Sequence, residues 1–377
     1  TALDTPNNGI PSETGFVITP ASEIMAVLCL SEGLEELRKK IDNIFLGFTF
    51  AGEPFTTNDL GVTGAITALL KDAIQPNLVQ TLEGTPAMVH GGPFANIAHG
   101  CNSLMATKTA LQFGDYVVTE AGFATDLGAE KFFNIKCRKA GLQPAMSVLV
   151  ATSQALKLSG GADAKTMMLP DMAVLAKGVR NLEKHISILK SFKQKVLVVL
   201  NRYQFDTVEE ITWLRNWCAE KDVAFAVNDG FTNGGEGALE MAQAVVDICE
   251  NPSPPIQYTY ELSDDIETKI RKIATTIYGA TDVVLYKKAQ DMIKKIKTLG
   301  LEQLPVCMAK TQYSFTHDPT KSGLDGDFKI DVDDLVINQG AGFIVAVCGE
   351  MVRMPGLPKI PQANNIDVVD GKIIGVS

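Results

Sequence analysis

The chain of 377 residues lacks the features that mark membrane, secreted and nucleic-acid-binding proteins. No apolar run approaches the roughly 18 residues of a membrane span, and no secretory signal peptide is visible. The seven cysteines are scattered and never spaced as CxxC, which favours reduced thiols over a disulfide framework. The formal net charge of −10 argues against non-specific binding to nucleic acid or to anionic membranes. We therefore expect a cytoplasmic protein.

Two phosphate-binding motifs are also missing. The chain contains no GxxxxGK[ST], and no GxGxxG follows a predicted strand. A nucleotide site built from this chain alone would therefore lack its usual phosphate-binding loop. The chain opens at Thr1, and residues 4–11 have the Pro/Asn/Gly-rich composition of a loop. We expect residues 1–14 to be the loop remnant of a missing N-terminal part.

What is present predicts an α/β protein. Residues 15–78 read as a small α+β module, with helices over 21–30, 34–44 and 62–73 around a strand at 45–50. Residues 79–250 alternate β-branched runs with helix-like segments, which predicts a parallel sheet covered on both faces. The predicted strands are 87–89, 116–119, 147–150, 196–200 and 224–227, and the predicted helices are 103–113, 128–138, 171–192, 207–220 and 235–250.

A proline-rich segment at 252–255 predicts a boundary, after which residues 251–377 form a C-terminal α+β domain. Its predicted elements are helices over 265–278 and 289–299, strands near 328–330 and 342–347, and an extended tail over 354–361. In the preceding parallel sheet, all five strands would deliver their following loops to one edge. Those loops are rich in glycine and amides, so we expect a composite ligand site there.

The segment 89–103 follows a strand and holds three glycines, two histidines and a cysteine. His90, His99 and Cys101 have a spacing that matches no common zinc site, and no fourth ligand is evident. Cys101 beside a histidine is a possible thiol nucleophile, although nothing nearby supplies an oxyanion hole. The alternative is that the histidines shape a polar loop and that the cysteine is buried.

Other positions at predicted strand ends are also candidates for ligand binding. Glu120, with Asp126 nearby, follows a strand and could hold Mg²⁺ through water, or the two could cap a helix. Asn201 ends the most apolar strand and could read a purine edge. Tyr203 and Phe231 lie on consecutive strand-end loops and could clamp a flat ring, or they could pack on the core.

The segment 89–103 resembles a signature of formate–tetrahydrofolate ligases, and the resemblance extends from about Gly15 to the end of the chain. The further segments that carry it are 70–78, 119–123, 126–133, 234–237, 307–314, 340–343 and 354–358. The resemblance implies an ATP-dependent ligase that phosphorylates formate and passes the formyl group from formyl phosphate to N10 of tetrahydrofolate. It also implies a homotetramer, a need for Mg²⁺ and activation by monovalent cations.

The resemblance implies a P-loop-NTPase-like parallel sheet core, incomplete here, with two smaller α+β domains. The family's phosphate-binding loop, a second glycine-rich signature and the arginine for formyl phosphate would lie upstream of Thr1, so the catalytic residues are expected in that missing part. The folate clamp would fall on Tyr203, Gln204 and Phe231, where the family commonly has Phe-Pro and Trp. Gln154 replaces a common arginine, and Ala124-Thr125 replaces glycine-alanine.

The nucleotide wall implied by the resemblance consists of Ala151, Thr152, Gly160, Gly161 and Asn201. The function expected for the complete enzyme is ligation of formate to tetrahydrofolate, with this chain supplying the folate clamp, part of the adenine wall and the Mg²⁺-side carboxylate of Glu120. One alternative is a non-catalytic fragment for folate binding or oligomerisation, because the phosphate-binding loop is absent. The other is a thiol hydrolase that uses Cys101.

Overall fold

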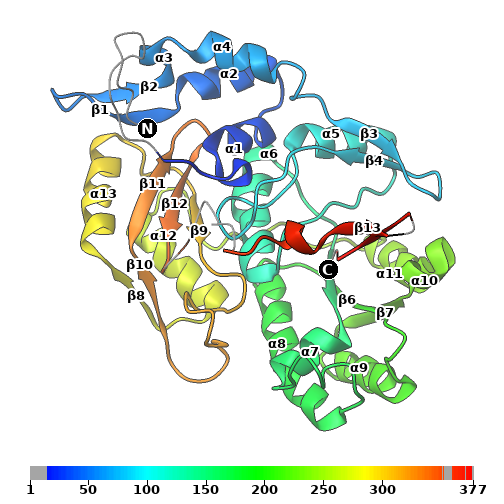
Figure 1. Ribbon diagram of the computed structural model, residues 1–377. Coiled ribbons are helices and arrows are strands. Elements are labelled where there is room, and N and C mark those ends of the chain that lie inside the picture. The colour runs from blue at the N-terminus through cyan, green and yellow to red at the C-terminus, as the bar shows by residue number, and fades with distance from the viewer. Residues whose placement is uncertain (1–14, 350, 352–358, 370, 376–377) are drawn as a thin grey trace.

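The computed structural model describes residues 15–349, 351, 359–369 and 371–375, and it shows a mixed α/β protein (Figure 1). The segment predicted as a loop remnant, 1–14, and most of the tail predicted over 354–361 lie outside the described residues. The first elements are a short 3₁₀ helix and four α-helices beside the antiparallel pair β1–β2. They are η1 (Thr19–Ala21), α1 (Glu23–Cys29), α2 (Leu34–Asp42), β1 (Phe45–Phe48), β2 (Pro54–Thr56), α3 (Thr57–Leu60) and α4 (Thr63–Leu70).

The middle of the chain contains a parallel sheet with the order β5-β6-β7. We call residues 147–249 the parallel unit. Its central strand β6 (Val196–Asn201) is buried along almost its whole length, as expected for a near-continuous apolar run. The other elements of the unit are β5 (Ser147–Ala151), α7 (Ser153–Ser159), α8 (Met172–Ser191), α9 (Val208–Glu220), β7 (Ala224–Asn228), α10 (Gly230–Asn233), η4 (Gly234–Ala238) and α11 (Leu239–Cys249).

The prediction of five parallel strands is wrong at its first two members. Strand β4 (Pro86–Val89) pairs antiparallel with β3 (Asn77–Gln80), and residues 116–119 form no strand. The hairpin is favoured because only five residues separate its strands and Gly84 takes a left-handed conformation in the turn. Thr119 instead donates a hydrogen bond to the Asn102 side chain (3.0 Å), which ties that segment to the loop before α5 (Leu104–Phe113).

Two stretches predicted as α-helices contain π-helical turns. Residues 128–138 form η2 (Thr125–Ala129), η3 (Phe132–Cys137) and α6 (Arg138–Ala140). Residues 265–278 form α12 (Ile266–Ile273) followed by η5 (Ala274–Tyr278). The first stretch is almost wholly buried and includes Lys131 and Lys136, whose ammonium groups reach backbone and side-chain oxygens. Tertiary contacts of this kind outweigh the intrinsic preference for an α-helix.

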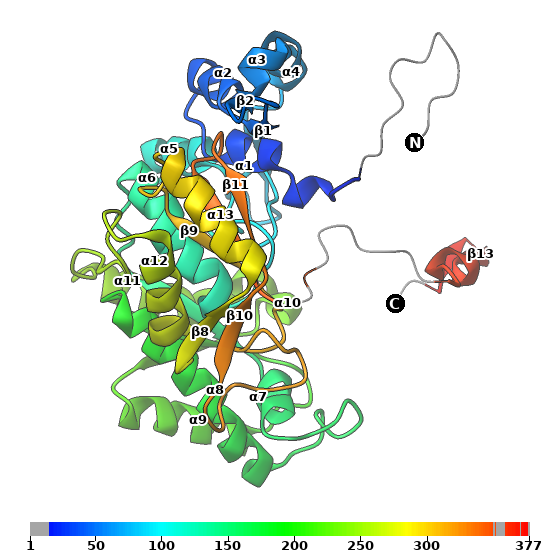
Figure 2. The ribbon, with the colours of Figure 1, turned by 90° about the vertical axis from the view of Figure 1, so that its left-hand side faces the viewer.

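The C-terminal unit, residues 266–347, contains two small sheets. Strand β12 (Phe343–Val347) lies between β9 (Val306–Ala309), which is parallel to it, and β11 (Asp334–Asn338), which is antiparallel. Strands β8 (Asp282–Leu285) and β10 (Lys329–Val332) form a parallel pair, and α13 (Lys287–Thr298) packs beside the unit. Figure 2 shows the last hairpin apart from the other elements. It consists of η6 (Gln362–Asn365), β13 (Asp367–Val369) and β14 (Lys372–Ile374).

Candidate functional site

Hydrogen bonds join the loops that leave β5, β6 and β7 into one row along the carboxyl edge of the parallel sheet. Ser153, which follows β5, donates to the Asp206 carboxylate in the loop after β6. The other Asp206 oxygen accepts from the Tyr203 backbone N–H at 2.8 Å. The Arg202 N–H donates to the Asn228 carbonyl at 3.0 Å, and its guanidinium lies 3.6 Å from Asp229. The edge predicted to hold ligands is therefore a connected rim of three loops.

Two aromatic side chains project from this rim. Tyr203 is 45% exposed and Phe231, at the start of α10, is completely exposed. The Tyr203 ring stacks on Phe205, with centroids 5.3 Å apart and planes 10° from parallel, so one face of Tyr203 is already covered. Phe205 was not predicted as a site residue, although it lies two residues from Tyr203. The neighbouring Gln204 is exposed.

Two amides lie between the loops that carry these aromatic rings. Asn201 and Asn228 are register partners at the ends of β6 and β7. The Asn228 side-chain amide donates to the Asn201 side-chain oxygen at 2.8 Å, and its own oxygen accepts from the Gly230 N–H at 3.2 Å. Within the described part of the chain, the Asn201 amide N–H groups have no acceptor, so they can donate to a ligand. Such a pair can bind the edge of a purine or of another ring with alternating donors and acceptors.

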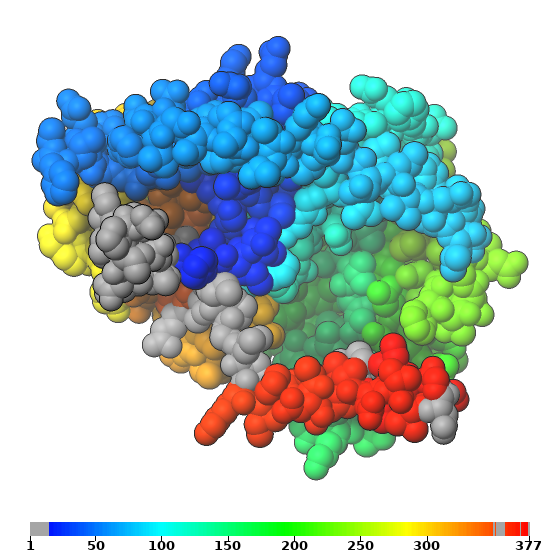
Figure 3. All heavy atoms as spheres, turned by 45° about the horizontal axis from the view of Figure 1, so that its top comes forward, coloured from blue at the N-terminus to red at the C-terminus, as the bar shows by residue number. Residues whose placement is uncertain are grey.

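The tip of the β3–β4 hairpin reaches the same rim. The Glu83 carboxylate accepts a hydrogen bond from the Gly235 N–H at 2.9 Å, in η4, which directly follows α10. A side chain at Gly235 would bring its Cβ within 3.0 Å of that carboxylate. On the face seen in Figure 3, the molecule is hollowed between its blue-to-cyan N-terminal elements and the green residues of the parallel unit.

The residues expected to form a nucleotide wall have different surroundings. Thr152, next to Ala151, caps α7 by accepting from the Ala155 N–H at 3.1 Å. Gly160 lies where α7 crosses α8, and a Cβ there would come within 2.0 Å of the Val174 carbonyl oxygen. Gly161 has a φ of +105° and open space around it. The geometry gives Gly160 a packing role, and a nucleotide role for these residues stays a prediction.

Glu120 is exposed, and its carboxylate forms no hydrogen bond or ion pair with the residues that the structure describes. Asp126, the other acidic candidate, forms a 2.9 Å ion pair with the buried Lys310. Among the residues that the structure describes, no three His, Cys, Asp or Glu side chains gather as a metal site. Mg²⁺ commonly takes only one or two protein carboxylates and completes its shell with water and phosphate oxygens, so a role for Glu120 beside Mg²⁺, through water, stays a prediction.

The histidines and the cysteine of segment 89–103 are structural. His90 is buried, with its ring nitrogens 2.6 Å from the Ser103 hydroxyl and 2.7 Å from the Ala73 carbonyl. His99 is fully buried without a hydrogen bond, and burial lowers its pKa to about 3. Burial raises the pKa of Cys101 to about 12, so its thiol is not ionised near neutral pH. This geometry argues against both the metal and the thiol-hydrolase interpretations.

Phe123 is a further candidate, and it lies in the segment 119–123 that carries the family resemblance. Its φ is +62°, a conformation that is strained for a non-glycine residue, and its ring is half-exposed. The turn is fixed on both sides, because Gly122 donates to the Gly100 carbonyl at 2.9 Å and a Cβ at Gly128 would overlap the Gly122 carbonyl. Residues with a strained backbone are concentrated at functional sites, but the sequence does not predict which residues are strained.

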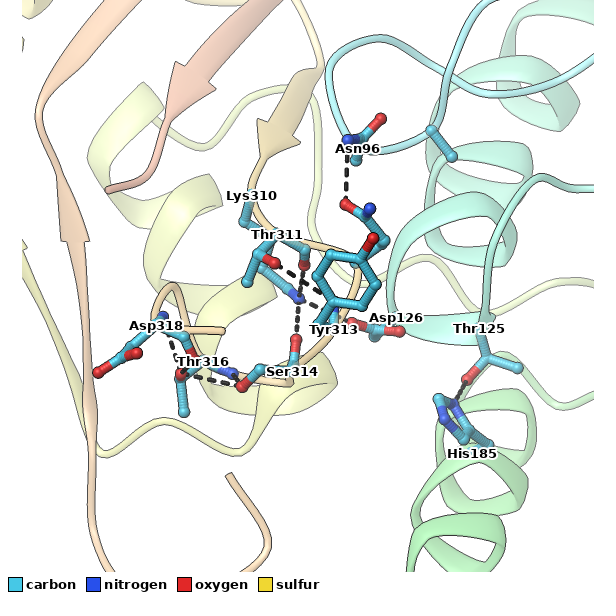
Figure 4. A network of polar contacts seen from close by, with 12 residues as sticks. Asn96, Thr125, Asp126, His185, Lys310, Thr311, Tyr313, Ser314, Thr316 and Asp318 are labelled. Atoms are coloured by element: carbon cyan, nitrogen blue, oxygen red, sulfur yellow. Dashed lines mark hydrogen bonds and ion pairs between the residues drawn. The ribbon is translucent and has the colours of Figure 1, made fainter. Parts of the chain in front are cut away.

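A buried polar network fixes the loop that follows β9 (Figure 4). The Lys310 ammonium pairs with Asp126 and donates to the carbonyls of Thr311, at 3.0 Å, and of Ser314. The Gln312 side-chain oxygen accepts from the Asn96 amide at 3.1 Å, which joins this loop to segment 89–103. The network leaves the Tyr313 ring exposed. Residues 310–314 belong to the segment 307–314 that carries the family resemblance, but none of their contacts was predicted from the sequence.

Pockets of about 390 and 410 Å³ lie elsewhere on the described part of the chain, and neither is lined by Tyr203, Phe231 or Asn201. The seven cysteines are all free thiols. Within the described part of the chain, no helix combines the length and apolarity that crossing a membrane requires.

Comparison with known proteins gives a consistent result. A family model described as formate--tetrahydrofolate ligase matches residues 1–377. The formate--tetrahydrofolate ligase of Parabacteroides distasonis is 58% identical over 371 residues, covering 98% of this chain and 67% of the relative. That of Bacteroides thetaiotaomicron is 58% identical over 372 residues, with the same coverage of both chains. That of Campylobacter curvus is 52% identical over 373 residues, covering 98% of this chain and 68% of the relative.

Proposed function

The chain belongs to the formate–tetrahydrofolate ligase family, and we propose that it takes part in the ATP-dependent ligation of formate to tetrahydrofolate by holding the folate. The observation that carries the proposal is the pair of exposed rings, Tyr203 and Phe231, on neighbouring loops tied to one another by Arg202. Aromatic rings on a fixed rim can stack on both faces of a flat bicyclic ring. Gln204 lies at the same rim.

The amide pair Asn201 and Asn228 supports recognition of a ring edge at this rim. The free N–H groups of Asn201 would meet an acceptor on the adenine of ATP, on the side of the site that Ala151 and Thr152 line. Gly160 and Gly161 extend that wall in the proposal. The parallel sheet beneath these residues would then belong to a P-loop-NTPase-like core, of which this chain contributes β5, β6 and β7.

The proposed reaction has two steps. A formate oxygen attacks the γ-phosphorus of ATP, the bond to the bridging oxygen of ADP breaks, and formyl phosphate forms. The N10 lone pair of tetrahydrofolate then attacks the formyl carbon, phosphate leaves with the C–O electron pair, and N10 loses a proton. The contribution of Tyr203 and Phe231 is to orient N10, because holding reactants in place removes much of the barrier to a bimolecular step.

The length of the chain and the lack of a phosphate-binding motif favour a second function, which is binding without catalysis. The chain spans 67% of the length of its Parabacteroides relative and contains no GxxxxGK[ST]. On its own it would then bind folate, or assemble with other chains, without catalysing ligation. Activation by monovalent cations and a homotetrameric state remain predictions from the family resemblance.

Calorimetric titration of the purified chain with tetrahydrofolate tests the folate site. We expect Tyr203→Ala and Phe231→Ala each to weaken binding by roughly 5- to 100-fold, the range for loss of one stacking partner. Phe50→Ala is the matched control, because Phe50 is equally exposed but lies in the β1–β2 turn. Unchanged binding in both rim variants would contradict the clamp.

Incubation with formate, Mg-ATP and tetrahydrofolate separates the two functions. After acid treatment, the methenyl product is followed by its absorbance. Product at an ordinary ligase rate would support catalysis by this chain alone. Saturable folate binding without product would support the binding function.

A further inference from the structure

The pocket of about 410 Å³ lies between segments that are far apart in the sequence. Its main walls come from α2, from the junction of η3 with α6, and from the turn between β11 and β12. Small-molecule sites commonly enclose about 300–1,000 Å³. The pocket is therefore large enough for a small organic ligand, and it is separate from the rim that carries Tyr203 and Phe231.

The turn between β11 and β12 forms a fixed wall of this pocket. The Glu23 carboxylate accepts hydrogen bonds from the Gly340 N–H at 2.7 Å and from the Ala341 N–H at 3.2 Å. A Cβ at Gly340 would come within 2.6 Å of the Lys40 carbonyl oxygen, so the turn lies directly against α2. A wall that is already held in place lowers the cost of ordering a site when a ligand binds.

Arg138 lines the pocket without a carboxylate partner. Its guanidinium donates to the Asn134 carbonyl at 3.1 Å and to the Tyr260 carbonyl at 2.6 Å. The guanidinium carbon also lies 3.9 Å from the centre of the Tyr258 ring. Among the described residues, no carboxylate forms an ion pair with Arg138, and its Nη1 group has no acceptor. An arginine held in this way presents a fixed set of donors to an oxyanion.

Two lysines add positive charge to the same pocket. The Lys40 side chain is only 14% exposed and donates to the Leu30 carbonyl at 2.6 Å, and burial lowers the pKa of Lys40 to about 8. Lys139 pairs with Glu36 at 2.9 Å, and the same carboxylate lies 3.7 Å from Lys40. One carboxylate therefore faces three cations when Arg138 is included, which leaves an excess of two positive charges.

The other carboxylates near these cations have partners of their own. Glu32 pairs with Lys108 at 2.7 Å. Glu130, which lies within electrostatic reach of Arg138, accepts a hydrogen bond from the Asn134 amide at 2.7 Å. Burial raises the pKa of Glu130 to about 7, so this group carries less than a full negative charge near neutral pH. Within the part of the chain that the structure describes, the positive excess is therefore not cancelled.

We propose that this pocket is a second ligand site, separate from the folate rim, and that it takes a small phosphate monoester. The phosphate would contact the three cations, because a dianion matches an excess of two positive charges. Arginine and lysine are the side chains that most commonly bind phosphate. The organic part of the ligand would contact the apolar lining residues Ile135, Leu262 and Pro305.

Calorimetric titration with phenyl phosphate tests the site. We expect saturable one-to-one binding that is at least 10-fold tighter than the binding of orthophosphate or of benzoate. Lys40→Met removes a buried charge partner of the phosphate and should weaken the binding of phenyl phosphate by roughly 10- to 100-fold. Lys288→Met is the matched control, because Lys288 is exposed on α13, and it should leave the affinity unchanged.

A second variant guards against a folding defect in Lys40→Met. Asn43 lines the pocket and is exposed at the end of α2, so Asn43→Trp would fill the pocket while keeping all three cations. It should also weaken the binding of phenyl phosphate at least 10-fold. Both variants should still bind tetrahydrofolate as the wild-type protein does, because the folate rim is a different site.

Four results would overturn the proposal. They are the absence of saturable binding, equal affinity for benzoate, full affinity in both pocket variants, and loss of phenyl phosphate binding in Tyr203→Ala. The last result would place the probe on the folate rim instead of in this pocket. The proposal does not depend on the folate clamp, so failure of one leaves the other standing.

Discussion

The parallel unit and the C-terminal unit differ in how completely their sheets are closed. In the C-terminal unit, β12 has a strand on each side, β9 is fully buried, and the loop after β9 is held by the buried Lys310. In the parallel unit, β5 pairs with only one strand among the described residues, Val148 and Val150 are partly exposed, and the strand-end loops carry exposed rings. The candidate ligand residues lie on the more open unit. Binding residues commonly occur on exposed loops that a rigid scaffold supports, and the C-terminal unit has the character of such a scaffold.

The largest expected effect is at the contact that closes the C-terminal unit. Lys310→Met removes the partner of Asp126 and leaves a buried carboxylate uncompensated, at a cost of about 3–5 kcal/mol in the free energy of unfolding. Urea denaturation measures it. Lys294→Ala is the control, because its ion pair with Asp291 is exposed and should change stability by less than about 0.5 kcal/mol. Similar losses in the two variants would show that the buried pair adds no special stability.

The pH dependence of stability tests the buried helices that precede the parallel unit. Burial raises the pKa of Glu130 from 4.5 to about 7, and one of its carboxylate oxygens has no hydrogen-bond partner. Between pH 4.5 and 7 the folded chain keeps a proton that the unfolded chain releases, so stability falls as the pH rises through this interval. Relative to Glu130→Gln, the wild-type protein should lose about 3 kcal/mol of unfolding free energy across it.

Urea denaturation at several pH values gives this difference directly. Glu23, whose pKa burial also raises to about 7, is present in both proteins and cancels in the comparison. Parallel pH profiles for the wild-type protein and Glu130→Gln would mean that Glu130 titrates normally in the folded chain.

A glycine substitution probes the helical layer of the parallel unit. A Cβ at Gly178 would lie 1.7 Å from the Leu156 carbonyl oxygen, so Gly178→Ala must push α8 away from α7. We expect a loss of roughly 1–3 kcal/mol in thermal or urea unfolding. Gly64→Ala, in α4 with open space around it, should instead stabilise by about 0.5–1 kcal/mol. A neutral Gly178→Ala would show that the two helices can separate freely.

The smallest expected effect concerns the support of the rim. Phe205→Leu keeps apolar bulk but removes the ring that stacks on Tyr203, a contact worth about 0.5–1.5 kcal/mol. Tetrahydrofolate binding, followed by calorimetry, should weaken by roughly 2- to 10-fold if the stack holds Tyr203 in its binding orientation. Phe48→Leu breaks an aromatic pair with Phe45 in the N-terminal elements and should leave folate binding unchanged. Equal affinities in the two variants would remove Phe205 from the site.

Much of the local structure could be predicted from the sequence. The predicted helix over 171–192 corresponds to α8, and that over 207–220 corresponds to α9, where Thr207 and Glu210 form a capping box. The strands at 147–150, 196–200 and 224–227 were predicted correctly as a parallel set. These features could be predicted because they depend on local patterns, namely the spacing of apolar residues and the residues that cap helix ends. The candidate rim followed from them, because parallel strands place their loops on one edge.

The contacts between distant segments could not be predicted in this way. The sequence suggested that Asp126 lies near a metal ion or caps a helix. In the structure its charge is balanced by Lys310, which is far away along the chain. Phe205 and the strained Phe123 also escaped assignment, because a stacking partner and a positive φ depend on how whole loops are held. The position of the rim could therefore be predicted from the sequence, but the residues that support it could not.

The sequence by itself determined the family, the apolar strands and most helix positions of this protein, because these depend on composition and on short-range patterns. Only the tertiary structure decided that β4 pairs with β3 rather than joining the parallel sheet, and that residues 116–119 form no strand. The physical reason is that a strand's own residues set its tendency to extend. Its partner is chosen by competition among all the edges and apolar faces that the folded chain brings together.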